Sequence, residues 1–397
     1  MRIALVSQEY PPETAKGGLG SQTYLKAHGL VSLGHEVHVI SRAGKTGRSE
    51  RNDNGVQVTR VPGFDARMAV HTEAADWLTY SAEVAAAVAS LHARAPLDVV
   101  DFPEWGAEGY VHLLNRTEWN RIPAVIQLHG PLVMFAHTMG WPDMDSEFYR
   151  AGTAMEGTCL RLADAIFSSS DCSADWCAKH YGLKRERIAT LHTGVDTQLF
   201  CPGNVPKAKR PTIIFAGKLA RNKGVRLLVD AVCRLAADYP DVQLRLLGRG
   251  DPQFIKELTG CASVAGRPGM LDLAGFVDRQ ELAGHLSRAH VFAAPSQYEG
   301  GPGFVYLEAM ACGLPVIACA GSGAAEVVRH GDNGLLVQAG DEDALVAALR
   351  SLLNDAPARQ SMGERGRQFV LAEADSRVCL KKLEAFYAAV AAGRSGL

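Results

Sequence analysis

The chain has 397 residues, which at roughly 100–200 residues per domain is enough for two or three domains with a core each. It carries 41 Lys and Arg against 43 Asp and Glu, a formal net charge of -2, so no overall positive field exists to hold nucleic acid or an anionic bilayer. Hydrophobic residues make up 47% and charged residues 21%, which excludes a disordered or fibrous chain. The 40 glycines exceed the usual share of ~7% and indicate many special backbone turns.

The nine cysteines form no CxxC pair and no cluster at the spacing of a zinc site. Their odd number and irregular spacing favour reduced thiols in a cytoplasmic protein that holds no metal. The first residues contain only a short apolar run before polar residues and prolines, which is typical of a buried strand and not of a signal peptide. Because no apolar run approaches the ~18 residues of a membrane span, we expect no integral membrane segment.

Short apolar runs alternate with longer helical patterns through the first half of the chain. The runs are continuously hydrophobic, so each expected strand is buried on both faces, as in a parallel sheet covered by helices. The main helical patterns cover residues 19–33, 73–95 and 148–162. The expected strands are 3–6, 37–40, 56–61, 99–102, 124–128, 165–167 and 188–191. This alternation predicts a doubly wound α/β domain over residues 1–198.

The same alternation starts again in the second half, and predicts a second α/β domain over residues 212–374. Its expected helices include 225–237 and 344–353, and its expected strands are 213–216, 244–247, 271–277, 291–294, 316–319 and 335–337. Residues 199–211 contain three prolines and no periodicity, and are interpreted as a linker. The basic cluster of Lys207, Lys209 and Arg210 in this linker is interpreted as solvated. We expect residues 375–397 to form a C-terminal helix that packs back on the first domain.

The first glycine-rich loop follows the first expected strand. Gly17, Gly18 and Gly20 open a helix there, and glycines at a helix N-terminus allow backbone N–H groups to approach a phosphate closely. The loop fits equally well a turn that needs positive φ. It is not the dinucleotide fingerprint GxGxxG.

A second glycine loop follows the strand at 213–216. Lys218, Arg221 and Lys223 lie between Gly217 and Gly224, at the carboxyl edge of a buried strand. Three cations in six positions beside glycines favour a diphosphate clamp over solvated surface lysines.

Two glutamates flank the third loop. Glu299 follows a strand in a turn rich in glycine and proline, and Glu308 lies in the helix that comes next. Paired carboxylates also serve glycosidases as acid and nucleophile. Here they bracket a helix N-terminus, whose N–H groups suit an anion or sugar hydroxyls. A further glycine turn ends at Glu326 and half matches GxGxxG.

In this order, these motifs resemble the retaining glycosyltransferases of the GT-B fold, glycosyltransferase family 4. The resemblance covers essentially the whole chain. Its matching elements are the loop of Gly17 and Gly18, His129 with Gly130, Thr193 to Asp196, Gly217 to Gly224, Gly275 to Val277, and Glu299 with Glu308 to Ala311. It implies an α/β architecture of two Rossmann-like domains that face a central cleft, with the acceptor on the first and the nucleotide sugar on the second.

The resemblance also implies roles for particular residues. Lys218 and Lys223 neutralise the donor diphosphate, Glu299 holds the sugar, Glu308 holds the ribose, and His129 reaches the transferred sugar. The implied catalytic residues are His129, Lys218, Lys223 and Glu299. The other implied donor-binding residues are Gly17, Gly18, Phe276, Val277, Gly303, Phe304, Val305 and Glu308. The candidate acceptor residues are Glu9, Lys16, Glu104 and Trp105.

The implied reaction moves a sugar from a nucleotide diphosphate, with a UDP-sugar favoured, to an unidentified acceptor hydroxyl with retention of configuration. It uses front-face attack and no metal or cofactor. The alternative is a sugar-nucleotide epimerase or hydrolase on the same architecture; a dinucleotide-dependent dehydrogenase and a catalytically silent binding protein fit less well.

Three features depart from the family pattern. Eight residues separate the two glutamates instead of seven, a lysine stands at 218 where arginine is common, and Gly-Ser-Gly-Ala-Ala precedes Glu326.

Overall fold

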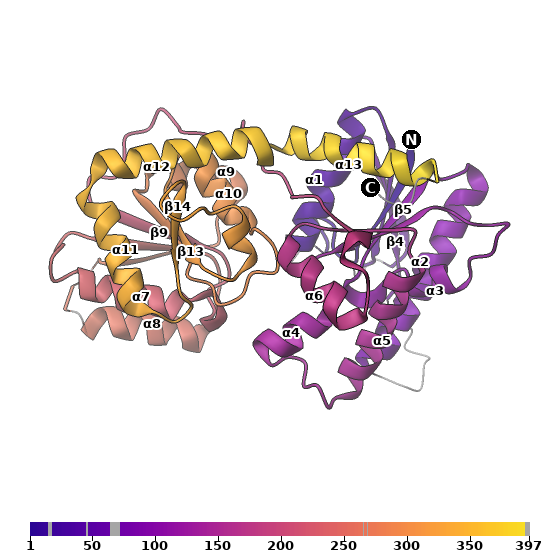
Figure 1. Ribbon diagram of the computed structural model, residues 1–397, viewed down its shortest axis with the longest axis horizontal. Helices are drawn as coiled ribbons and strands as arrows, with labels where there is room; N and C mark the ends of the chain where they lie inside the picture. Colours follow the sequence, from indigo (N-terminus) through magenta and orange to yellow (C-terminus); the bar gives the residue numbers. More distant parts are fainter. Residues whose placement is uncertain (15–17, 45–46, 64–71, 265, 268, 394–397) are drawn as a thin grey trace. The chain divides into compact units, whose positions relative to one another are not determined.

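The computed structural model describes residues 1–14, 18–44, 47–63, 72–264, 266–267 and 269–393. The chain divides into two compact units, one of Met1–His192 with Cys379–Leu397 and one of Thr193–Val378. Each unit is a mainly parallel sheet with helices on its faces (Figure 1). The predicted architecture of two Rossmann-like α/β domains is therefore confirmed.

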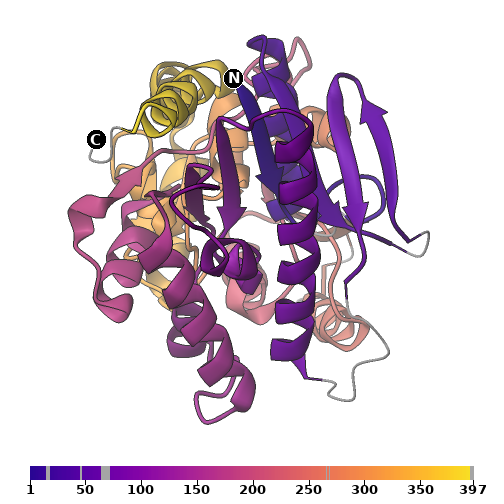
Figure 2. The same ribbon diagram turned by 90° about the vertical axis from the view of Figure 1, so that its right-hand side faces the viewer.

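The first unit is built on an eight-stranded sheet of order β3-β4-β2-β1-β5-β6-β7-β8. All neighbours pair in parallel except β3 and β4, which form a hairpin at one edge (Figure 2). The strands are β1 (Arg2–Val6), β2 (Glu36–Arg42), β3 (Ser49–Asp53), β4 (Val56–Val61), β5 (Val99–Pro103), β6 (Ala124–Leu128), β7 (Ala165–Ser168) and β8 (Ile188–Thr190). Since β2 lies on one side of β1 and β5 on the other, the strand order reverses at β1.

Helices cover both faces of this sheet, and the side chains of β1 show how. Ile3 and Leu5 point to a core shared with α1 (Gly18–Ser32) and α13 (Ser376–Ala391). Ala4 and Val6 point to the opposite core. That core is shared with α2 (Glu73–Arg94), α5 (Glu147–Leu162) and α6 (Asp171–Tyr181). The continuous apolar runs of the sequence thus reflect burial on both faces. Shorter helices are η1 (Trp105–Ala107), α3 (Tyr110–Leu114), α4 (Leu132–Met139) and η2 (Arg185–Arg187).

A buried polar cluster ties α13 to the sheet. The carboxylate of Asp101, on β5, accepts hydrogen bonds from Lys26 Nζ at 2.5 Å and from the hydroxyl of Tyr387 on α13. Lys26 also donates to Gln127 Oε1 at 2.6 Å. Because breaking a buried ion pair leaves an uncompensated charge, this cluster fixes the position of α13 on the first unit more specifically than apolar contacts alone.

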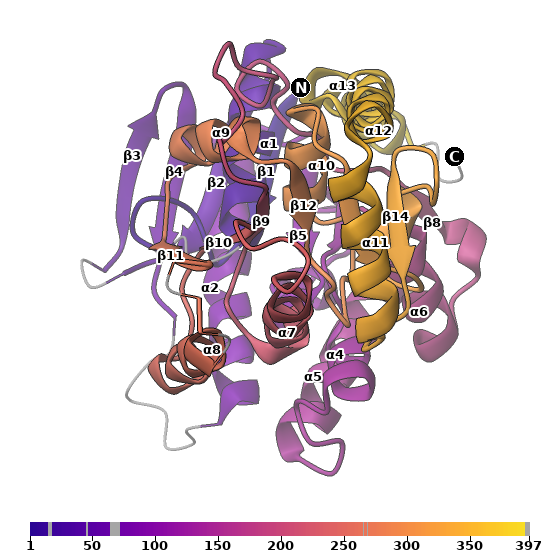
Figure 3. The ribbon, with the colours of Figure 1, turned by 90° about the vertical axis from the view of Figure 1, so that its left-hand side faces the viewer.

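The second unit is built on a parallel sheet of order β11-β10-β9-β12-β13-β14, with β11 and β14 at its two ends (Figure 3). Its strands are β9 (Thr212–Ala216), β10 (Gln243–Leu247), β11 (Leu271–Gly275), β12 (Val291–Ala293), β13 (Val316–Cys319) and β14 (Gly334–Val337). Its helices are η3 (Arg221–Lys223), α7 (Val225–Leu235), α8 (Pro252–Val264), α9 (Arg279–Arg288), α10 (Phe304–Ala311), η4 (Gly323–Glu326), α11 (Glu342–Asn354), α12 (Ala356–Phe369) and the π-helical η5 (Val370–Ala374). The strand order reverses between β9 and β12, which is where ligands bind to open α/β sheets.

Within the described residues, no helix is both long and apolar enough to cross a bilayer. The eight cysteines whose surroundings are described form no disulfide with one another.

Candidate active site

The chemistry-bearing loops of the second unit gather at one edge of its sheet. All six strands are parallel, so the loops after β9, β10, β11, β12 and β13 leave from the same, carboxyl, edge. The loops after β9 and β12 flank the point of strand reversal. The sequence motifs that contain Lys218 to Lys223 and Glu299 are these two loops.

The loop after β9 is pressed against the loop after β12. Gly224 has φ +69, and a Cβ on it would lie 2.0 Å from the carbonyl oxygen of Pro295. Gln297 N–H donates to the carbonyl of Asn222 at 3.0 Å. Only glycine permits both this left-handed backbone and this approach, so the sequence at 224 determines where Lys223 lies.

Lys223 and Glu299 form an ion pair across the two loops. Lys223 Nζ donates to Glu299 Oε1 at 2.8 Å, and the side chains are 28% and 16% exposed. Lys218 is exposed and makes no ion pair or hydrogen bond with the described residues. Because an ammonium has three donors, Lys223 can hold Glu299 and still donate to an anion. The pair of lysines therefore leaves a net positive charge at the strand reversal.

The first turn of α10 is the second anion-facing feature. Its N-cap is Gly303, with φ +68, and no side chain caps the helix. A Cβ on Gly303 would lie 2.9 Å from Cδ2 of the buried Tyr306. The uncapped N–H groups of Phe304 and Val305 carry the positive end of the helix dipole. They can donate to phosphate or sugar oxygens.

Glu308 lies inside α10 and is almost fully buried, at 1% exposure. Its Oε1 is 2.8 Å from Arg279 Nη2, but the two groups are not aligned for a hydrogen bond, so both atoms lack a hydrogen-bond partner. Burial raises the pKa of Glu308, and the Arg279 guanidinium lowers it in part. A ribose hydroxyl that reached Oε1 would supply the missing donor.

Phe276 follows β11 and is 67% exposed, with the Arg249 guanidinium 5.1 Å from the centre of its ring. Val277, by contrast, packs against the core. Arg249 follows β10, and its carbonyl accepts from Leu219 N–H at 2.8 Å, which links it to the lysine loop. The sequence reasoning missed Arg249 and Arg279, although Arg249 stands between two glycines at a strand end, the signal used for the other loops.

The glycine turn after β13 supports the Glu299 loop. The N–H of Gly323 donates to the carbonyl of Glu299 at 2.8 Å. A Cβ at 323 would lie 2.5 Å from the carbonyl oxygen of Gly301. The residues before Glu326 depart from the family pattern, but they include Gly323, the glycine that this contact requires.

In the first unit, His129 follows β6 and its backbone is held by a buried carboxylate. The N–H groups of His129 and Gly130 donate to Glu104 Oε1 at 2.7 and 2.6 Å, and His129 N–H is also 2.8 Å from Oε2. Glu104 follows β5 and is 0% exposed. Burial raises the pKa of Glu104 to about 7, against the lowering effect of the two N–H donors. Glu104 therefore orients the His129 loop.

A second buried carboxylate holds the other end of this loop. Glu156 accepts from Leu132 N–H at 3.0 Å and from the Tyr181 hydroxyl at 2.6 Å.

Burial of the imidazole and, less strongly, the charge of Lys26 lower the pKa of His129 to about 3. His129 is therefore neutral near pH 7, so one nitrogen of its ring can donate a hydrogen bond and the other can accept one.

The other predicted residues of the first unit lie as follows. Glu9 follows β1, and its carboxylate accepts from Gly20 N–H at 3.3 Å, in the first turn of α1. Trp105 is half-buried, with its ring 5.7 Å from that of Trp77 and 5.4 Å from that of Phe135. Gly18 begins α1, and a Cβ there would meet no atom within 4 Å. Lys16 and Gly17 lie outside the described residues.

Within the part of the chain that the structure describes, no three His, Cys, Asp or Glu side chains are grouped as they would be around a metal ion.

Comparison with known proteins identifies the family. Residues 17–194 match the family model for the glycosyl transferase 4-like domain, and residues 201–369 match the model for glycosyl transferases group 1. The chain belongs to the group 1 glycosyltransferases and is a transferase enzyme of the GT-B fold.

Two curated relatives align along almost the whole chain. One is the GDP-mannose-dependent alpha-(1-6)-phosphatidylinositol monomannoside mannosyltransferase of Mycolicibacterium smegmatis, 29% identical over 93% of this chain and 94% of the relative. Another is the D-inositol 3-phosphate glycosyltransferase of Corynebacterium diphtheriae, which is 28% identical over 98% of this chain and 94% of the relative. Among solved structures, sucrose-phosphate synthase from Thermosynechococcus elongatus superposes with a TM-score of 0.81 at 24% identity, over 98% of this chain and 99% of that one.

Proposed function

We propose that this enzyme transfers a hexose from a nucleotide diphosphate sugar, with UDP as the nucleotide, to an acceptor hydroxyl with retention of anomeric configuration. The observation that carries the proposal is the carboxyl edge of the second unit. There the free cation of Lys218, the paired cation of Lys223 and the uncapped start of α10 surround one strand reversal. Such an edge suits a diphosphate with a sugar attached.

The reaction breaks the bond between the anomeric carbon and the donor phosphate oxygen, and negative charge grows on the leaving diphosphate. Lys218, Lys223 and the N–H groups of α10 stabilise that charge, which is the largest catalytic contribution available to them. The acceptor oxygen attacks the same face, and its proton passes to the departing phosphate oxygen. Glu299 positions the sugar, and the neutral ring of His129 hydrogen-bonds to it.

The acceptor residues receive different parts in this proposal. Glu9 and the exposed side of Trp105 remain candidates for contact with the acceptor, whereas Glu104 has no exposed surface and is assigned to positioning His129. Lys16 keeps its proposed acceptor role on sequence grounds alone. A half-buried tryptophan beside a strand end suits stacking against a sugar ring.

The nucleotide is tested by thermal shift with UDP, GDP and ADP, each with and without its hexose. A ligand at 100 times its Kd stabilises the folded state by about 2.7 kcal/mol, so the preferred nucleotide should give the largest rise in Tm. A preference for GDP, the nucleotide in the name of the mannosyltransferase relative, would replace UDP in the proposal. No shift with any of the three would contradict donor binding at this edge.

Product analysis separates transfer from the alternatives. Transfer with retention predicts a glycoside of the donor's configuration that forms only when an acceptor is present, as seen by NMR. Free hexose or an epimerised donor in the absence of acceptor would identify a hydrolase or epimerase instead. Since two lysines supply the positive charge, we expect turnover to survive EDTA; loss of turnover that Mg²⁺ restores would show that a metal is needed.

A further inference from the structure

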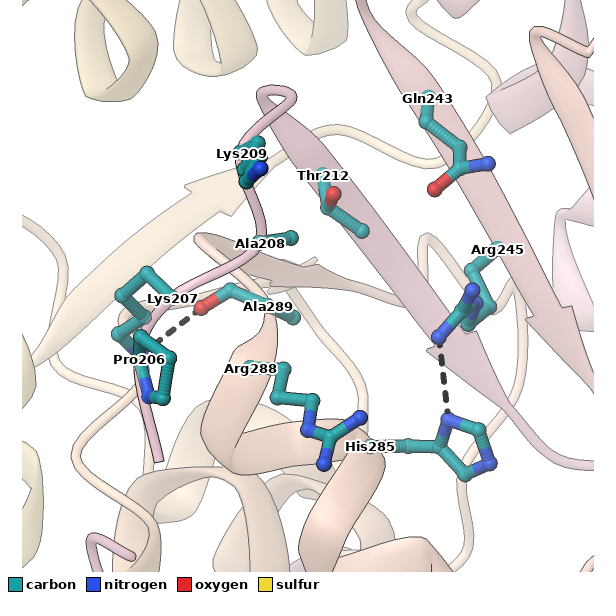
Figure 4. A pocket seen from close by; sticks show the side chains of 10 residues that line it. All are labelled: Pro206, Lys207, Ala208, Lys209, Thr212, Gln243, Arg245, His285, Arg288 and Ala289. Atoms are coloured by element: carbon teal, nitrogen blue, oxygen red, sulfur yellow. Dashed lines mark hydrogen bonds between the residues drawn. The ribbon is translucent and has the colours of Figure 1, made fainter. Parts of the chain in front are cut away.

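The second unit has a cavity at the edge of its sheet opposite to the catalytic loops. Its volume is about 430 Å³, and it is lined by Thr212 and Gln243, which begin β9 and β10, together with side chains of α9 and the segment 206–209 (Figure 4). Parallel strands start at one edge and end at the other, so this cavity is separate from the Lys218 and Glu299 loops.

The segment 206–209 is packed against the end of α9. The N–H of Ala208 donates to the carbonyl of Arg288 at 2.9 Å, and Lys207 Nζ donates to the carbonyl of Ala289 at 2.8 Å. Lys207 and Lys209 are nevertheless exposed, in line with the solvated basic cluster that the sequence suggested. The segment lines one side of the cavity and lies beside the start of β9 (Figure 4).

The lining is strongly positive. Lys207, Lys209, Arg245 and Arg288 line the cavity, and none of the described lining residues is acidic. Lys209 and Arg288 are exposed and make no ion pair or side-chain hydrogen bond with any described residue. Arg245 is paired with the carboxylate of Asp272 at 2.8 Å. Two cations are therefore available to an anion.

Neutral donors lie beside these cations. Arg245 Nη1 lies 3.2 Å from His285 Nδ1, so the neutral imidazole accepts at Nδ1 and carries its proton on Nε2. The side-chain amide of Gln243 makes no hydrogen bond with the described residues. In Figure 4 the Arg288 guanidinium extends into the space between Ala289 and His285.

We propose that this cavity binds a phosphate monoester of a small polyhydroxy molecule, such as a sugar phosphate. Lys209 and Arg288 hold the phosphate, and Gln243 with His285 hold hydroxyl groups. The volume lies in the range of small-molecule sites, roughly 300–1,000 Å³, and the cavity, which is open to solvent, is bordered by two strands, a helix and a segment, so it suits a compact ligand. The site is independent of the proposed transfer reaction.

Calorimetry with inorganic phosphate, glucose 6-phosphate and glucose tests the proposal on the full chain. Because the lysines at the catalytic edge could also bind phosphate, the titrations are repeated with Lys223→Ala. The test variant is the double substitution Lys209→Ala with Arg288→Ala, two exposed residues whose loss should leave the fold intact. Lys256→Ala, which removes an exposed cation of α8 outside the cavity, is the matched control.

We expect glucose 6-phosphate to bind more tightly than phosphate, and glucose not to bind. The double variant should lose about tenfold or more in affinity, whereas Lys223→Ala and Lys256→Ala should bind as the parent does. Equal affinity in the double variant would overturn the site. So would loss of binding in Lys223→Ala alone, or binding to anionic lipid vesicles, titrated in the same way, without binding to glucose 6-phosphate.

Discussion

At the scale of single residues, the cations of the second unit differ in how well they are held. Lys223 is fixed by Glu299 at 2.8 Å, whereas Lys218 is exposed and has no partner among the described residues. A group that is fixed before the reaction loses less entropy when the transition state forms. In the proposed reaction we therefore expect Lys223 to supply the larger share of the stabilisation of the leaving diphosphate.

The substitution Lys223→Ala should lower kcat/KM by roughly 10²–10³, about 2.7–4 kcal/mol, as when one preorganised donor is removed. Lys218→Ala should lower kcat/KM by a smaller factor. Steady-state kinetics with the preferred donor measures both, and Lys223→Arg should restore part of the rate because it keeps the charge. An unchanged kcat/KM in Lys223→Ala would remove this residue from the donor site.

The carboxylate of Glu104 should affect the chemistry only through the loop that it holds. This carboxylate accepts hydrogen bonds from the N–H groups of His129 and Gly130, and its pKa is raised to about 7. Protonation below pH 7 therefore weakens these hydrogen bonds. We expect the kcat of the parent to fall as the pH drops below about 7. Glu104→Gln should have a lower kcat with little change in KM, and should lose this acid dependence.

The exposed Glu118→Gln serves as the control for Glu104→Gln, since it removes one surface carboxylate from the same unit. If the kcat of Glu104→Gln still falls at acid pH as the kcat of the parent does, another group is responsible for that fall.

At the scale of elements, the start of α1 offers a test that separates ligand binding from folding. A Cβ at Gly18 would meet no protein atom within 4 Å, so no contact in the structure requires glycine there. Gly18→Ala should leave Tm nearly unchanged while raising KM for the donor, because the methyl group occupies space that the diphosphate needs. Thermal unfolding and donor kinetics measure the two effects. A large fall in Tm with normal KM would mean that Gly18 serves the fold.

The strands that could be predicted are those buried on both faces. The expected strand at 124–128 is β6 with the same bounds, because its continuous apolar run can only be covered on both sides. The strand β3, Ser49–Asp53, was missed because it lies at a sheet edge and carries polar and charged side chains. Its position depends on antiparallel pairing with β4, which no local pattern signals.

The sequence predicted the candidate site residues that lie in glycine-rich loops at strand ends. It did not predict the role of the residue whose function depends on being buried. The glycine loops led to Lys223 and Glu299, which the structure brings to 2.8 Å of each other. From the sequence, Glu104 was only a candidate acceptor residue beside Trp105. Its three short contacts to backbone N–H groups follow from β5 and β6 being neighbours, which the sequence order alone does not reveal.

At the scale of the whole molecule, two buried carboxyl groups of the first unit, Glu104 and Glu108, make the stability depend on pH near neutrality. Burial raises the pKa of Glu104 to about 7 and that of Glu108 to about 8. The Oε1 of Glu108 accepts from Gln8 N–H at 3.0 Å, and its Oε2 has no partner. The folded chain therefore holds these protons at pH values where the unfolded chain has released them.

A raised carboxyl pKa stabilises the protonated fold, so its contribution is complete below the unfolded value near 4.5 and is lost as the pH rises through the folded value. Histidines work in the other direction, since burial lowers the pKa of His129 to about 3 and that of His112 to about 4. Their contribution is complete above about pH 6.5 and is lost as the pH falls. Between pH 6.5 and 8 the histidines of the unfolded chain lose their remaining protons, so the carboxyl groups increasingly dominate the slope.

We therefore expect the free energy of unfolding to fall between pH 6.5 and 8, by up to about 1.4 kcal/mol per pH unit for Glu108. Glu108→Gln removes this titrating group. Its free energy of unfolding should therefore change less with pH, and the curve should cross that of the parent as the pH rises. Urea unfolding followed by far-UV circular dichroism measures the slope, with Glu118→Gln as the exposed control. Parallel curves for parent and Glu108→Gln would show that the Glu108 carboxyl is ionised in the fold, and that the unpartnered Oε2 is solvated.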